Sequence, residues 1–193
     1  MTDQPQIGPQ IIEAFQGYSP PFEPTSLIRR MLKNVPPQFL AGLHAIVLTN
    51  ASALSREERN RKTRGRGQSF SLGSALGYYS QAWKGEPARV TILVDNIEKQ
   101  WGVSWLRIGF IRDLELSEIL FHELGHHIHQ IHRPEYEGKE NVADKWAQKF
   151  SRRFIRDRYS YLLPLLVPVA IAFGVVKGSA KFCRKLRLKS LQN

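Results

Sequence analysis

The segment LELSEILFHELGHHIHQIH spans residues 114–132 and holds all but one of the chain's six histidines. Its aliphatic side chains recur every three or four residues, which predicts an amphipathic helix with one buried stripe. The stripe consists of Leu116, Leu120, Leu124, Ile128 and Ile131. Asp113 is the predicted N-cap of this helix, and Pro134 is expected to end it just after His132.

Within this helix, residues 122–126 read His-Glu-Leu-Gly-His. Positions i and i+4 lie on one face of a helix, so His122 and His126 can offer two imidazole nitrogens to the same metal ion. Glu123 would then lie beside the open side of the metal, where a carboxylate can take a proton from water and return it to a leaving group. Short motifs also arise by chance, and the alternative is a surface helix with incidental histidines. The pattern predicts a catalytic zinc (Zn2+) site with Glu123 as the base.

Two histidines leave a tetrahedral zinc site incomplete, and three kinds of residue compete to be the third ligand. His132 lies where metzincin peptidases carry their third histidine. However, position 129 is histidine where metzincins have glycine, and no methionine follows downstream. A nearby side chain such as His129 or Glu135 is the second possibility. The third is Glu140.

Glu140-Asn-Val-Ala-Asp144 follows the first motif after a short connection. A Glu-x-x-x-Asp helix after a His-Glu-x-x-His helix resembles the gluzincin type of zincin metallopeptidase, in a minimal single-domain form. The resemblance implies that Glu140 ligates zinc and that Asp144 holds a ligating histidine by its other ring nitrogen. Such a carboxylate fixes the tautomer of the imidazole. The alternative is that both acids are the solvated side of the helix and pair with Lys145 and Lys149.

The second helix is also expected from its own apolar spacing, after a turn at Gly138. Its core face would consist of Ala143, Trp146, Ala147, Phe150 and Phe154. Upstream, a helix is expected from Thr25 or Ser26 to Asn34, followed by a strand over residues 44–48. Residues 75–79 and 89–94 are the predicted strands of a hairpin whose turn lies at 84–87.

Strands followed by two metal-ligand helices indicate an α+β domain. The resemblance implies a small zincin-like domain with a short sheet, in which the edge strand of the hairpin pairs with an extended substrate. Main-chain pairing of this kind binds many sequences and leaves specificity to side-chain pockets. Gly77, Tyr78 and Tyr79 would line that edge and bind substrate. The alternative is a plain hairpin with two half-buried tyrosines.

The domain organisation follows from composition and from the extent of the resemblance. Residues 1–24 are rich in proline and are expected to form an extended or disordered arm. The zinc metallopeptidase domain is assigned to residues 25–158. Residues 159–176 form a hydrophobic segment, and residues 177–193 form a basic tail.

The net charge of +11 is concentrated in residues 56–66, 145–158 and 177–189, which are rich in Lys and Arg. Such clusters commonly meet nucleic acid or anionic lipid, although a solvated flexible insert is the simpler interpretation of 56–66. Residues 159–176 carry no charge and, as a helix, would measure about 27 Å against a hydrocarbon core of about 30 Å. Basic flanks on both sides favour a shallow or re-entrant membrane segment over a full span. Association with an anionic membrane is therefore expected, and the alternative is a soluble core or oligomer-forming segment.

The single cysteine, Cys183, excludes an intramolecular disulfide, and the N-terminus lacks the pattern of a secretory signal. The catalytic domain is therefore expected to face the cytoplasm. The predicted function is hydrolysis of peptide or protein substrates by a zinc-activated water. The alternatives are a non-enzymatic zinc module that binds nucleic acid or anionic lipid, and a DNA-associated protease that uses the basic loop. Glu123 favours an enzyme, because a structural zinc site needs no base.

Overall fold

The computed structural model describes residues 8–65, 68–132 and 139–162. Its strands are β1 Gln10–Ala14, β2 Leu43–Thr49, β3 Lys62–Gly65, β4 Gln68–Ser71, β5 Gly77–Ser80 and β6 Ala88–Leu93. Its α-helices are α1 Pro24–Leu32, α2 Arg56–Asn60, α3 Val94–Trp101, α4 Val103–Leu106, α5 Gly109–His132 and α6 Lys139–Tyr159. The chain divides into two compact units, Met1–Ile155 and Arg156–Asn193, so the last residues of α6 belong to the second unit.

Four strands form one mixed sheet in the order β1-β2-β6-β5, which places β1 and β5 at its two edges. β2 pairs in parallel with β1 and β6, whereas β6 pairs antiparallel with β5. The central strands β2 and β6 are almost entirely buried, as expected for aliphatic runs inside a sheet. β3 and β4 form a separate antiparallel hairpin. The fold is α+β, as the order of elements in the sequence predicted.

The hairpin of β5 and β6 is confirmed, with β5 as the edge strand. At its turn, Trp83 and Glu86 exchange two backbone hydrogen bonds of 3.0 and 2.9 Å. Between them, Lys84 and Gly85 have φ angles of 47° and 88°. Two successive left-handed residues are typical of the tight turns that match the twist of a hairpin. The predicted strand over 89–94 ends at Leu93, because Val94 begins α3.

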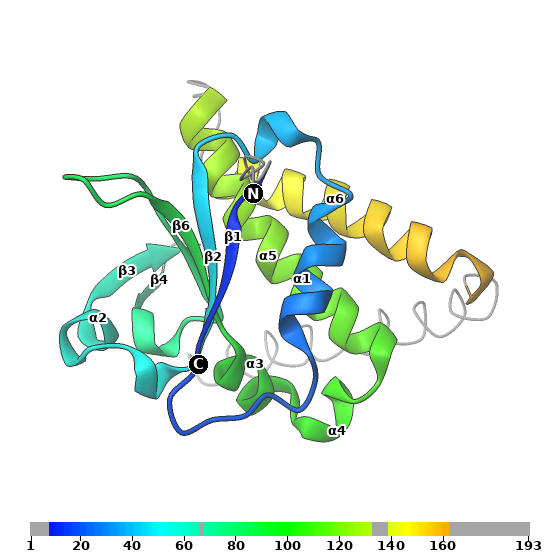
Figure 1. Cartoon of the computed structure of the whole chain (residues 1–193), viewed down its shortest axis with the longest axis horizontal. Coiled ribbons are helices and arrows are strands. Elements are labelled where there is room, and N and C mark those ends of the chain that lie inside the picture. Colours follow the sequence, from blue (N-terminus) through cyan, green and yellow to red (C-terminus); the bar gives the residue numbers. More distant parts are fainter. Residues whose placement is uncertain (1–7, 66–67, 133–138, 163–193) are drawn as a thin grey trace, which may run out of the picture. The chain divides into compact units, whose positions relative to one another are not determined.

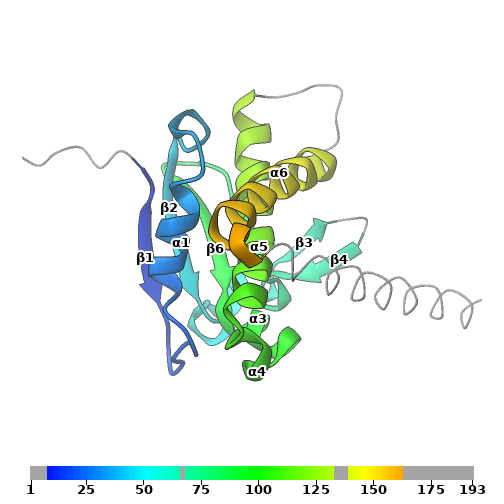
Figure 2. The same ribbon diagram turned by 90° about the vertical axis from the view of Figure 1, so that its right-hand side faces the viewer.

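Helices α1, α5 and α6 lie on the same side of the four-stranded sheet (Figures 1 and 2). The predicted stripe of α5 is buried at Leu116, Leu120, Leu124 and Ile128, whereas Ile131 is 43% exposed. The stripe therefore ends one turn earlier than expected. On α6, the buried residues include Val142, Ala143, Ala147, Phe150 and Phe154, whereas Trp146, also predicted for this face, is partly buried. Phe150 stacks on Trp146 and contacts Phe121 of α5, which joins the two helices.

The structure corrects two expectations about where its elements begin. Helix α5 begins at Gly109, so Asp113 is not its N-cap. Asp113 is instead fully buried inside the helix, where Arg112 forms an ion pair with it at 2.9 Å and neutralises its charge. Residues 10–14, assigned to an extended or disordered arm, form β1 and pair with residues 45–49 of β2. A short exposed strand leaves little hydrophobic periodicity to detect.

The basic segment 56–66 is folded as far as it is described, and the expectation of a flexible insert is wrong there. The Ser55 hydroxyl caps α2 by accepting a hydrogen bond from the backbone N–H of Glu58, and the Glu58 carboxylate accepts one from the backbone N–H of Ser55, which completes a capping box. β3 then pairs with β4.

The hydrophobic segment expected at 159–176 lies outside the described residues from 163 onward, as does the basic tail at 177–193. None of the helices in the described ranges is long and apolar enough to cross a lipid bilayer.

Candidate metal centre

Three possible metal ligands converge from two helices. The ligand atoms of His122, His126 and Glu140 lie within 4.8 Å of one another. Oε2 of Glu140 is 3.6 Å from Nε2 of His122, and Oε1 is 3.8 Å from Nε2 of His126. Within the described ranges, no other three His, Cys, Asp or Glu side chains come close enough to share an ion. This His-His-Glu group could hold a metal ion, and it contains the three residues that the sequence predicted.

Asp144 contacts His122 at the ring nitrogen that does not face Glu140. Its Oδ1 lies 3.0 Å from Nδ1 of His122, while Nε2 of that ring faces Glu140. The two nitrogens of His122 thus face two carboxylates that are one helical turn apart on α6. A carboxylate at Nδ1 keeps a proton on that nitrogen and leaves Nε2 free to donate its lone pair. This is the position that the resemblance implied for Asp144.

The close crossing of α5 and α6 depends on Gly125. A Cβ atom at this position would lie 2.6 Å from Cα of Ala143 and 2.9 Å from its carbonyl oxygen. Real Cβ atoms essentially never come this close to another backbone, so only glycine allows this spacing. The contact falls between His122 and His126 on one helix and between Glu140 and Asp144 on the other. Gly125 therefore lets the carboxylates of α6 reach the histidines of α5.

Glu123 lies in a cleft of about 300 Å³ together with the three candidate ligands, and it is only 9% exposed. Edge strand β5 forms one wall of this cleft with Gly77, Tyr78 and Tyr79. The remaining lining residues are Thr63, Phe70, Gln81, His129 and Gln130. Thr63 and Phe70 are directly paired across the β3–β4 hairpin, so they share one face of it. The sequence did not indicate that this hairpin would border the cleft.

Gly77 brings the edge strand close to Glu123. A Cβ atom on Gly77 would lie 3.2 Å from Cγ of Glu123 and 3.0 Å from a methyl group of Ile119. Both distances are tighter than nearly all real Cβ contacts. A larger residue at this position would push on the carboxylate or move the strand away from α5. The absence of a side chain at Gly77 thus keeps β5 beside the base.

His127 links this wall to the opposite side of α5. Its Nε2 lies 3.0 Å from the carbonyl oxygen of Ala41, and its Nδ1 lies 3.1 Å from the hydroxyl oxygen of Tyr79. Because a carbonyl only accepts, Nε2 carries the proton, and the neutral ring then accepts the Tyr79 hydroxyl at Nδ1. Burial lowers the pKa of His127, against a smaller opposite effect of the Ala41 bond, and so favours this neutral form. No role for His127 is predicted from the sequence pattern.

Both tyrosines of β5 remain protonated over a wide range of pH. Burial raises the pKa of Tyr79. Burial also raises the pKa of Tyr78, and the hydrogen bond between Tyr78 and Thr91 opposes this effect. At neutral pH the wall therefore presents hydroxyl groups and aromatic rings, with no negative charge from these side chains.

The other candidates for the third metal ligand are not found in the three-residue group. His129 lines the cleft but is not part of the three-residue group. Glu135 lies outside the described residues, and His132 is the last residue of α5.

Comparisons of the chain with protein-family models, with curated proteins and with solved structures found no match.

Proposed function

We propose that this chain is a zinc-dependent metallopeptidase of the gluzincin type, with a small zincin-like domain. The observation that carries the proposal is the His122, His126 and Glu140 group. Tetrahedral zinc with bonds of ~2.0–2.1 Å separates its ligand atoms by about 3.4 Å. The two Glu140–histidine separations of 3.6 and 3.8 Å need only a small contraction to fit, and all three ligand atoms lie within 4.8 Å of one another. Two imidazoles and one carboxylate also leave a fourth position open, as catalytic zinc requires.

The chain supplies a base and a binding edge around this position. When bound, zinc polarises a carbonyl group and lowers the pKa of water. Glu123 accepts the proton of the attacking water and donates it to the leaving amine. The free edge of β5 pairs with an extended peptide, and Tyr78 and Tyr79 contact its side chains. Asp144 holds the tautomer of His122.

The proposal is tested by metal analysis together with cleavage assays. Changing His122, His126 or Glu140 to Ala should strip the zinc, because a site with two ligands binds weakly. Glu123→Gln should keep the zinc and abolish cleavage in a proteome-wide comparison with the wild type. Glu118→Gln is the matched control, because Glu118 is an exposed residue of the same helix. Equal zinc content in Glu140→Ala and wild type would remove Glu140 as a ligand and make His132→Ala the decisive variant.

A non-enzymatic zinc module that binds nucleic acid or anionic lipid is the competing function. It predicts a zinc-loaded wild type that leaves the proteome intact and a Glu123→Gln variant that behaves identically. A DNA-associated protease would instead show salt-dependent DNA binding that is lost when residues 56–66 are deleted. These residues include α2 and β3, and β3 borders the proposed substrate cleft through Thr63.

For the location, we propose a cytoplasm-facing domain that attaches to anionic membranes through residues 159–176. Truncation after residue 158 should release a soluble catalytic domain, whereas the full chain should pellet with anionic vesicles. High salt alone should not detach it, because burial of apolar area is not screened as surface charge is. A full-length protein that stays soluble without detergent or vesicles would contradict this attachment.

A further inference from the structure

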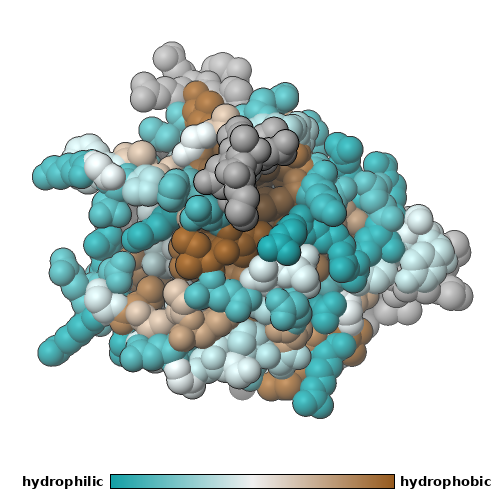
Figure 3. All heavy atoms as spheres, viewed as in Figure 1, coloured by the Kyte–Doolittle hydropathy of each residue, from teal (hydrophilic) through white to brown (hydrophobic). Residues whose placement is uncertain are grey.

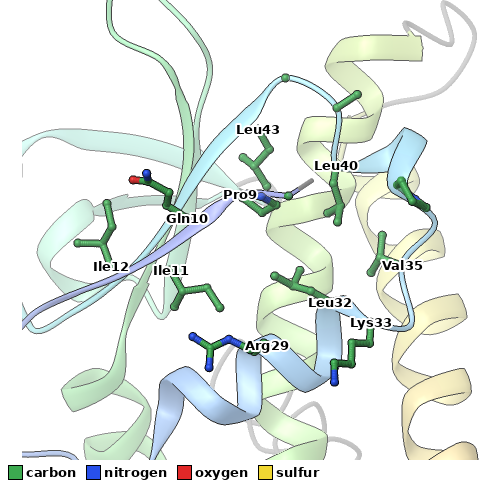
Figure 4. A pocket seen from close by; sticks show the side chains of 14 residues that line it. Pro9, Gln10, Ile11, Ile12, Arg29, Leu32, Lys33, Val35, Leu40 and Leu43 are labelled. Carbon is green, nitrogen blue, oxygen red and sulfur yellow. The ribbon is translucent and has the colours of Figure 1, made fainter. Parts of the chain in front are cut away.

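A large groove in the described part of the chain lies away from the metal centre, at the opposite edge of the sheet. It has a volume of about 1010 Å³ and runs between β1, α1 and the segment that leads into β2. Figure 4 shows Ile11 and Leu32 between β1 and α1, while Ile12 points to the other side of the strand. In the view of Figure 3, apolar atoms are exposed where β1 and α1 lie. This groove, lined in part by residues 8–12, is called the β1 groove below.

The β1 groove follows a free strand edge. Five consecutive residues, 8–12, line it, so it extends along the strand and does not merely meet it at one point. β1 is an end strand of the sheet, and no described strand pairs with its outer edge. Such an edge carries backbone N–H and C=O groups that are free to pair with another chain. The groove thus offers both a main-chain ladder and space for side chains beside it.

The chemistry of the β1 groove is apolar and cationic. Its apolar residues include Ile11, Leu32, Val35, Leu40 and Leu43. Its charged residues are Arg29 and Lys33, which lie four positions apart and therefore on one face of α1. Both are exposed, and no ion pair with another described residue is found for either. Among the residues that the structure describes, no acidic side chain lines the groove.

We propose that the β1 groove binds an extended, acidic segment of a partner protein, which adds to β1 as a fifth strand of the sheet. Apolar side chains of the segment would pack on Ile11 and Leu32, and its carboxylates would pair with Arg29 and Lys33. A second copy of this chain is a poor occupant, because two grooves brought together would place like charges opposite each other, and the whole chain carries a net charge of +11. This site is independent of the proposed peptidase activity.

The test uses a fluorescein-labelled peptide with the sequence Val-Thr-Glu-Thr repeated twice. In a strand this peptide puts valine and glutamate on one face and threonine on the other. Binding to the full chain is followed by fluorescence anisotropy. The double variant Arg29→Glu/Lys33→Glu should bind about five- to tenfold more weakly, from the loss of two exposed ion pairs and the added repulsion. Arg30→Glu is the matched control and should bind like wild type, because Arg30 is equally exposed on α1 but does not line the groove.

Three further measurements separate strand addition from other binding modes. A peptide with lysine in place of both glutamates should not bind measurably, and equal binding would overturn the assigned charge. The same acidic peptide, N-methylated at its central residues, cannot donate main-chain hydrogen bonds and should lose binding. Unchanged affinity for the methylated peptide would overturn strand addition. Concentration-dependent dimers in sedimentation velocity, or binding of oleate without binding of the acidic peptide, would show a different occupant and overturn the proposal.

Discussion

Gly125 of α5 and Ala143 of α6 approach so closely that a Cβ atom on Gly125 would lie 2.6 Å from Cα of Ala143. Glycine inside a helix normally costs about 1 kcal/mol relative to alanine. Here the opposite sign is expected, because the atoms that would be displaced belong to the backbone of α6. The distance between the helices also sets how far Glu140 must reach to meet His122 and His126.

The first prediction follows from this contact. Gly125→Ala should lower the free energy of unfolding by about 1–3 kcal/mol, as overpacking does, and weaken metal binding because α6 must move outward. Urea unfolding and zinc titration measure the two effects. Combining it with Ala143→Gly should not rescue either, because the contacts at 2.6, 2.9 and 3.1 Å are all to backbone atoms. A Gly125→Ala protein that is more stable than wild type and binds zinc equally well would show that the helices are not this close.

The second prediction concerns the carboxylate behind His122. Asp144→Asn should keep the fold but weaken zinc affinity or activity by roughly 10- to 100-fold, the usual loss for such a partner. Asp157→Asn is the control, since the two aspartate side chains are similarly exposed, at 46% and 48%, and only Asp144 contacts His122. If both variants bind zinc like wild type, the 3.0 Å contact has no role in ligand orientation.

The third prediction concerns removal of the metal. A metal that binds only the folded chain stabilises it by about 4 kcal/mol at a free concentration near 1,000 times its dissociation constant. Chelation with EDTA should therefore lower the thermal unfolding temperature of the wild type, and added zinc should restore it. Glu140→Ala should unfold at the same temperature with and without EDTA. If the wild type unfolds at the same temperature with and without EDTA, no metal ion joins α5 to α6.

The fourth prediction concerns pH. Burial lowers the pKa of His127 below its ordinary value of 6.5. At pH values between the lowered pKa and 6.5, the unfolded chain therefore binds a proton more readily than the folded chain. Stability from this group is present above pH 6.5 and is lost as pH falls from there toward the lowered pKa. Metal-free wild type should therefore unfold at less urea at about pH 5.5 than at about pH 7.5.

Two variants isolate the contribution of His127 to this pH dependence. His127→Gln should show a smaller change with pH, because the amide does not titrate. Tyr79→Phe retains the histidine and should keep the dependence, although it loses the 3.1 Å bond to Nδ1. An identical pH dependence in wild type and His127→Gln would place the effect elsewhere.

The sequence predicted the parts of the fold that repeat with a clear period. The stripes of α5 and α6, the hairpin of β5 and β6, and the pairing of His122 with His126 follow from local spacing, whereas Glu140 was expected from the resemblance to gluzincins. It did not predict β1, because its five residues are mostly exposed and their stability comes from pairing with β2. The sequence also did not predict the start of α5, because aspartate is a common N-cap residue but Asp113 is buried beside Arg112 inside the helix.

The site was incompletely predicted for a similar reason. The His-Glu-x-x-His pattern assigns no role to Gly125, yet this glycine matters through a contact with Ala143, eighteen positions later. The contacts of His127 could not be predicted, because its partners, Ala41 and Tyr79, are far away in the sequence. Such contacts have no local pattern, so only the assembled fold reveals them. A glycine at the centre of a buried helix face was the one available signal for Gly125.

The division of the His-His-Glu group between two helices bears on how the protein is made. Synthesis proceeds from the N-terminus, and segments can fold as they emerge. When α5 leaves the ribosome it carries only His122 and His126, and Glu140 follows on a helix whose core residues Phe150 and Phe154 come later still. A nascent chain would therefore hold a metal ion weakly until α6 had docked. Metal capture would then come late in biosynthesis, so that an incomplete chain would not carry a finished centre.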